Sequence, residues 1–133
     1  MSNAAKVAKF LDDAGVFYFL TTDGAQPKGR PFSFYLLNDD KIYFGTGTFK
    51  ECFKQLTANP YVEVLAVTPT EFMRYDGKVK FVKGDDLMDK VREKMPQIMA
   101  MYDKNGWELG LFCLEDGHVE IRGMMDLKEE FDV

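Results

Sequence analysis

The segment over residues 45–50 carries residue types that can hold a phosphate group. It reads GTGTFK, overlaps the end of a β-rich run at residues 41–46 and leads directly into a segment with helical spacing of apolar residues. A helix start leaves backbone N–H groups unpaired and carries the positive end of the helix dipole. Glycines let an anion approach the backbone closely, threonine hydroxyls donate hydrogen bonds, and Lys50 adds a positive charge. The pattern predicts an anion cradle; the alternative is that Thr48 only caps the helix and that Lys50 is solvated.

Arg30 is the second cation that we expect near this cradle. It precedes Pro31 and Phe32 in the segment 29–37, which is predicted to be the strand before 41–46 in an antiparallel meander. Neighbouring strands would bring the guanidinium to the same anion, which it can bind in a fork geometry. The loop lacks the G-x-x-x-x-G-K-S/T pattern of nucleoside triphosphatases, so triphosphate hydrolysis is not expected.

Other side chains capable of chemistry have simpler expected roles. Cys52 and Cys113 form no C-x-x-C pair and are expected to be reduced thiols, as is typical of the cytoplasm. His118 is the only histidine, so no multi-histidine metal site is expected, and no signature pairs it with Cys52 as a nucleophile. Three tyrosines on predicted strands are expected to serve mainly in packing: Tyr35, Tyr43 and Tyr75.

The elements that position these residues are mostly short strands. Strands are predicted at 16–22, 29–37, 41–46, 61–67, 71–82, 108–114 and 118–123, with a hairpin turn at 115–117. Helices are predicted at 4–14, 48–58 and 87–102, the last one kinked or split at Pro96. The predicted helices are too few to cover a sheet of this many strands. The sheet is therefore expected to curl into a barrel that protects its edges. The fold class is mainly β (α+β), with six to seven mostly antiparallel strands and two or three flanking helices.

Length and composition set further limits. The 133 residues are 46% hydrophobic and suit one domain over residues 1–133 rather than a disordered or fibrous chain. No apolar run is long enough to span a membrane, and the first residues do not resemble a signal peptide, so a cytoplasmic location is expected. The net charge of −5 argues against a nucleic-acid partner. The 12 phenylalanines and 8 methionines fit either a core with an oligomer face or a pocket for a flat apolar ligand.

Six segments together resemble a known family. They read YFLTT (18–22), QPKGRPF (26–32), IYFGTGTFK (42–50), FKQLTANP (53–60), DGKV (76–79) and LEDGHVE (114–120). Their order and spacing, from Phe10 to Gly123, resemble the pyridoxamine 5′-phosphate oxidase-like family, the FMN-binding split barrels. The resemblance implies a split β-barrel that forms a homodimer, with FMN held in the grooves between the two subunits.

The resemblance also assigns roles to particular residues. The phosphate-binding residues of the family correspond here to Arg30, Thr46, Thr48 and Lys50, with Gly47 between the threonines. Pro31 and Phe32 would lie along the edge of the isoalloxazine ring. The partner subunit usually closes the pocket with an aromatic or basic residue, for which the candidates are Trp107 and Arg74.

The activity implied by the resemblance is that of an oxidoreductase acting on a small molecule through the flavin N5, with NAD(P)H as a candidate electron donor. The chain lacks the arginine-rich C-terminal segment of true pyridoxamine phosphate oxidases, which argues against vitamin B6 oxidation. Three alternatives stay open within the same fold: a non-catalytic flavin carrier or sensor, a deazaflavin user, and a haem-handling protein with His118 as axial ligand. A structural dimer with a vacant groove is the fourth.

Overall fold

The computed structural model describes residues 1–133 and contains four helices and eight strands. In chain order these are α1 (Asn3–Ala14), β1 (Phe17–Asp23), β2 (Gln26–Phe32), β3 (Leu36–Asn38), β4 (Lys41–Gly47), α2 (Glu51–Ala58), β5 (Tyr61–Val67), β6 (Phe72–Val82), α3 (Asp85–Lys94), α4 (Pro96–Asn105), β7 (Leu109–Arg122) and β8 (Leu127–Asp132). None of the helices is both long and apolar enough to cross a membrane.

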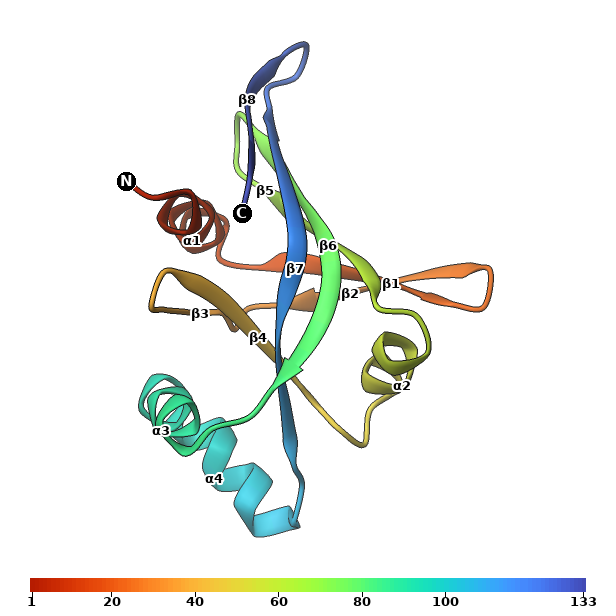
Figure 1. Ribbon diagram of the computed structural model, residues 1–133, viewed down its shortest axis with the longest axis vertical. Helices are drawn as coiled ribbons and strands as arrows, with labels where there is room; N and C mark the ends of the chain where they lie inside the picture. The colour runs from red at the N-terminus through yellow and green to blue at the C-terminus, as the bar shows by residue number, and fades with distance from the viewer.

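The strands form one antiparallel sheet that curves like a split barrel. Its order is β2-β1-β5-β6-β7-β4-β3, and β8 pairs with the outer half of β7 (Figure 1). The prediction of a mainly β, antiparallel split barrel is confirmed, with one more strand and one more helix than expected. The expected three-strand meander is wrong, because β2 pairs only with β1 whereas β4 pairs with β7 and β3.

The core is built on buried phenylalanines at alternating strand positions. Phe17 and Phe19 on β1, Phe44 on β4 and Phe112 on β7 are all fully buried. The ring of Phe44 lies 5.8 Å from that of Phe17, 5.9 Å from that of Phe19 and 5.8 Å from that of Phe112. Aromatic pairs at such centroid distances add to the free energy gained by burying their area. This cluster, with α1 packed beside it, holds the curved sheet together.

A second, smaller core lies on the outer face of the sheet, under α3 and α4. Val91 and Met99 of these helices pack there with Leu36 and Leu111 of the sheet. The helix predicted over 87–102 is split at Pro96, as expected, because proline can begin a helix but breaks one in its interior. Two of the eight methionines, Met73 and Met99, are buried in the two cores, so the core interpretation holds for these two.

The predicted hairpin at residues 115–117 is wrong. β7 runs without interruption from Leu109 to Arg122, and its register against β6 shifts between Asp76 and Lys78. The turn-forming residues make a bulge, in which Asp116 has a φ of 53°. The added residues at this point let a long strand bend instead of reversing it, so one continuous strand replaces the two predicted.

β8 was not predicted because its sequence, LKEEFD, is mostly charged. Backbone pairing and cross-strand side-chain contacts hold β8 to β7, and His118 makes two of these contacts. One ring nitrogen of His118 lies 2.8 Å from an oxygen of Asp132 and the other lies 3.0 Å from an oxygen of Glu130. These two carboxylates, Asp132 first, raise the pKa of His118 from 6.5 to about 9.

We expect this pair of contacts to stabilise the protein in a pH-dependent way. Because the folded-state pKa is raised, the contribution is complete below about pH 6.5 and is lost as the pH rises through about 9. The melting temperature of His118→Gln should therefore lie further below that of the wild type at about pH 6 than at about pH 9.5. The groups are exposed, so added salt should shrink the difference. A difference that does not change between the two pH values would contradict the role assigned to His118.

Candidate functional site

A cavity of about 410 Å³ lies where β2, β4, the start of α2 and α4 meet. Five of the residues singled out from the sequence line it together: Arg30, Pro31, Phe32, Thr46 and Lys50. β2 and β4 are far apart in the strand order, so the curvature of the sheet, rather than direct pairing, brings Arg30 and Lys50 to one place. Arg30 and Lys50 do lie at one cavity, as expected, but the meander expected to bring them together does not form.

The Arg30 side chain is fixed by three acceptors that carry no charge. Its Nη1 donates to the Thr21 hydroxyl at 2.8 Å and to the Phe19 carbonyl at 3.1 Å, and its Nη2 donates to Gln55 Oε1 at 2.7 Å. The Thr21 hydroxyl in turn donates to the same Gln55 oxygen at 2.6 Å. Thr21 and Gln55 are both buried, so this network is shielded from water. Arg30 is therefore held in place while its positive charge stays uncompensated.

Lys50 is the second uncompensated cation at this cavity. Neither it nor Arg30 takes part in any of the salt bridges of the protein. The carboxylate nearest in sequence, that of Glu51, pairs with Lys54 at 3.2 Å. Two cations without carboxylate partners make the cavity attractive to an anion.

The backbone at the start of α2 adds further donors. The first helical hydrogen bonds are made by the N–H groups of Phe53 and Lys54, both to the Lys50 carbonyl, so the N–H groups of Glu51 and Cys52 precede the ladder. The residue that caps the helix is Lys50, and no side chain caps it. The alternative is thus wrong in its expectation that Thr48 caps the helix, and the Thr48 N–H donates to the Glu108 carbonyl at 2.9 Å. Lys50 is exposed, as the same alternative expected.

Cys52 lies beside the cradle as a neutral thiol. Burial raises its pKa, against the lowering effects of Arg30, the Thr46 hydroxyl and Lys50. The thiolate is the nucleophilic form of cysteine, so a raised pKa argues against nucleophilic catalysis. His118, the only candidate base, is engaged with two carboxylates at the β7–β8 ribbon. The structure thus offers no Cys52–His118 pair, as the sequence led us to expect.

The remaining predicted residues lie around the cavity or away from it. Gly47 directly follows Thr46 but does not line the cavity. A Cβ atom at Gly47 would lie 2.5 Å from the Phe49 ring, so glycine is required there for the ring to pack. Thr48 and Trp107 line another cavity, of about 590 Å³. Arg74 is on β6, with Nη1 4.0 Å from Glu120, outside both cavities. A role for Trp107 or Arg74 in a partner subunit's site stays a prediction.

Sequence reasoning missed the residues that hold Arg30. Gln55 follows Cys52 by three residues and is a polar residue on the buried face of α2, which is a signal that could have been used. Thr21 occupies an inward position in the alternation of β1, where an apolar residue is the norm. A buried polar side chain on each of two elements predicts that they meet around a shared polar partner.

We expect Gln55→Leu to destabilise the protein by about 1–3 kcal/mol, because Arg30 and Thr21 each lose a buried acceptor. Urea unfolding followed by circular dichroism measures this free energy. Gln26→Leu is the matched control, since Gln26 is exposed and its amide reaches only the adjacent Pro27 carbonyl. Equal effects of the two substitutions would contradict the network.

The donor set of the cavity fits a phosphate dianion joined to a flat organic group. Arg30 and Lys50 supply charge, the Glu51 and Cys52 amides supply donors, and Thr46 supplies a hydroxyl. Beside these polar groups the cavity has apolar walls, which suit the body of a ring system: Pro31, Phe32, Phe34, Ile98 and Leu109.

Comparisons with known proteins bear on the family and the fold. A family model described as pyridoxamine 5′-phosphate oxidase matches residues 4–121. A NimC/NimA family protein from Clostridium acetobutylicum is 27% identical, with a TM-score of 0.88 over 100% of this chain and 95% of that one. No curated protein matches the sequence.

Two further solved structures share the fold at lower identity. A pyridoxamine 5′-phosphate oxidase-related, FMN-binding protein from Nostoc punctiforme is 16% identical, with a TM-score of 0.65 over 99% of this chain and 89% of that one. HutZ, the haem storage protein from Vibrio cholerae, is 13% identical, with a TM-score of 0.65 over 98% of this chain and 96% of that one. Since the family model spans most of the sequence, the chain belongs to the pyridoxamine 5′-phosphate oxidase family.

Proposed function

We propose that the protein binds FMN as a cytoplasmic homodimer and acts as an oxidoreductase on a small molecule. The observation that carries the proposal is the pair of cations, Arg30 and Lys50, which face one cavity without carboxylate partners. Its two cysteines are free thiols, which is typical of a reducing compartment. The family and the FMN-binding protein from Nostoc punctiforme support flavin as the group bound.

Four side chains at the cavity and the first amides of α2 have roles in this proposal. Lys50, Arg30 and the first amides of α2 bind the phosphate, and the fixed position of Arg30 keeps its cost in side-chain entropy low. Pro31 and Phe32 lie along the edge of the ring and exclude water from it. The flavin, when bound, supplies hydride or electron transfer at N5, and the protein supplies the position and the electrostatics.

The homodimer is part of the proposal because one chain alone leaves the cavity with Arg30 and Lys50 partly open. A second chain would cover the ring face, with Trp107 and Arg74 as the candidate contributions. NAD(P)H is the candidate electron donor.

A non-catalytic carrier of flavin or haem is the second candidate. It is favoured by the lack of an unpaired acid or base at the cavity. Burial raises the pKa values of both Cys52 and Tyr102 there, and the Glu51 carboxylate pairs with Lys54 at 3.2 Å. The haem storage protein from Vibrio cholerae has the same fold. His118 is a poor axial ligand in this chain, because both its ring nitrogens already face carboxylates.

The visible spectrum of the purified protein tests the cofactor. After incubation with excess FMN and desalting, we expect flavin absorbance at about one FMN per chain. A protein that retains no flavin would refute the proposal. Turnover of NAD(P)H or a model nitro compound by the FMN-loaded protein would support an enzyme, whereas stoichiometric FMN without turnover would support a carrier. A Soret band after addition of haem, in place of bound flavin, would support the haem alternative.

A further inference from the structure

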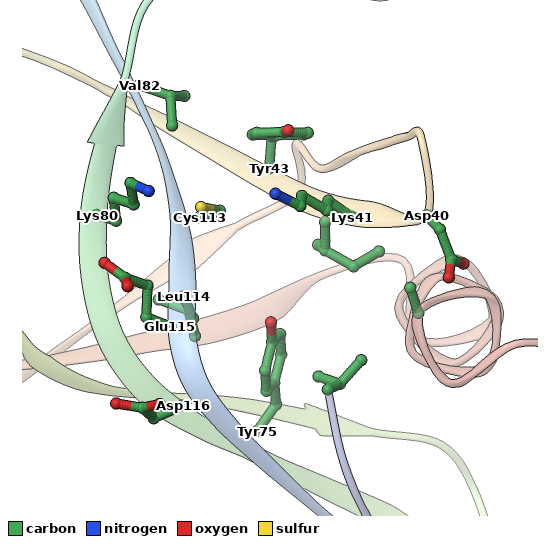
Figure 2. A pocket seen from close by; sticks show the side chains of 13 residues that line it. Asp40, Lys41, Tyr43, Tyr75, Lys80, Val82, Cys113, Leu114, Glu115 and Asp116 are labelled. Atoms are coloured by element: carbon green, nitrogen blue, oxygen red, sulfur yellow. The ribbon is translucent and has the colours of Figure 1, made fainter.

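A separate cavity of about 450 Å³ lies where β4 and β7 part from each other (Figure 2). These strands are paired only from Phe44 to Gly47 of β4, and the preceding residues of β4 pair with β3 instead. The cavity in this gap shares no lining residue with the cavity that holds Arg30 and Lys50.

Tyr75 points into this gap from the inside of the barrel. Its side chain is almost completely buried, with 3% of the residue exposed. Its ring is fixed by Phe44, at a centroid distance of 6.4 Å, and by Gly117, where a Cβ atom would lie 2.9 Å from the ring. Figure 2 shows its hydroxyl directed into the cavity, and that hydroxyl makes none of the side-chain hydrogen bonds of the protein. Burial raises the pKa of Tyr75, so the hydroxyl keeps its proton and is a donor without an acceptor.

Two lysines face the same space. The ammonium ends of Lys41 on β4 and Lys80 on β6 point toward Cys113 from opposite sides (Figure 2). Both act on the Cys113 thiol electrostatically, although burial raises its pKa overall. Neither lysine takes part in a salt bridge.

Three carboxylates also lie at this cavity, and none of them pairs with the lysines. Asp40 accepts a hydrogen bond from the Ser2 hydroxyl, and the side chain of Asp116 points away from the gap (Figure 2). Glu115 is the one carboxylate near the lysines, so a positive charge remains there.

We propose that this cavity binds a small carboxylate that has an apolar body. The carboxylate would accept hydrogen bonds from Tyr75 and from the ammonium groups of Lys41 and Lys80. The body would lie against the apolar part of the lining, which comprises Ile42, Val82, Leu114 and Val133. The anion would give the Tyr75 hydroxyl the acceptor that the protein does not supply, and would pair with two exposed lysines that form no salt bridge.

Benzoate is the probe, and isothermal titration of the full-length protein measures its binding. We expect binding of benzoate and at least tenfold weaker binding of benzyl alcohol, which has the same body without the charge. Tyr75→Phe should weaken benzoate binding at least tenfold, as should the double substitution Lys41→Gln, Lys80→Gln. Lys78→Gln is the matched control, because Lys78 is on the same strand as Lys80 but does not line the cavity.

Tyr75→Phe keeps the ring and removes only an unpartnered hydroxyl, so we expect it to fold with an unchanged melting temperature. Equal affinity of benzoate for wild type and a folded Tyr75→Phe would overturn the proposal, as would equal affinity for the two probes. Retention of FMN by the same variants is measured in parallel. Because the cavities are separate, we expect it to be unchanged, so that failure here and failure of the proposed function are distinguishable.

Discussion

Lys50→Gln should weaken the binding of FMN by roughly 10- to 150-fold, because a hydrogen bond to a charged group contributes about 1.5–3 kcal/mol. The substitution removes the charge of Lys50 and keeps most of its length. Lys50 forms no salt bridge that the substitution would break, so the fold should be unaffected. Titration of the apoprotein with FMN, followed by flavin fluorescence, measures the change.

Two comparisons make this result specific for the phosphate. Riboflavin lacks the phosphate, so it should bind more weakly than FMN. Its affinity should be the same for wild type and for Lys50→Gln. Lys28→Gln is the matched control, since Lys28 is exposed on β2 and does not line the cavity. An equal loss for riboflavin, or an equal loss in Lys28→Gln, would count against the cradle. Arg30 is less suitable for this test because it also completes the Thr21–Gln55 network.

The part of the site that is continuous in sequence could be predicted from the sequence. Thr46 and Lys50 lie in one strand-to-helix segment, and the end of a strand followed by a helix start is a local pattern. Arg30 does line the same cavity as Lys50, but the meander expected to bring it there does not exist. Strand order depends on long-range pairing, which short connections indicate only in part. β4 skips β2 and pairs with β7, more than 60 residues further along the chain.

The cavity at Tyr75 could not be predicted from the sequence, because it depends on how strands pair and separate. Tyr75 was expected to serve in packing, and its ring does so, but its hydroxyl is directed into a gap. That gap exists because β4 and β7 separate. The sequence at Asp116 and Gly117 predicts a hairpin turn, whereas β7 only bends there. A turn-forming pair has the same composition in a tight turn and in a bulge, and only the pairing of the flanking residues distinguishes the two.

Phe44→Ala should lower the free energy of unfolding by about 3–5 kcal/mol, which is a large part of the about 5–15 kcal/mol typical of a domain. Phe44 is fully buried and lies within 6 Å, between ring centroids, of Phe17, Phe19 and Phe112. Alanine would leave a cavity among rings that the strands on either side hold in place, so collapse around it is limited. Urea unfolding measures the loss.

Tyr18→Ala is the control for this substitution, because Tyr18 lies on β1 between two core residues but is 45% exposed. We expect that change to cost less than about 1 kcal/mol, since little buried area is lost. If both substitutions lowered the free energy of unfolding equally, the stabilisation would not come specifically from the buried cluster.

Phe44 is also two residues before Thr46 on the same inward face of β4. The core that closes the barrel therefore also fixes the strand that leads into the cradle, and FMN binding should be lost in Phe44→Ala at the urea concentration at which the chain unfolds.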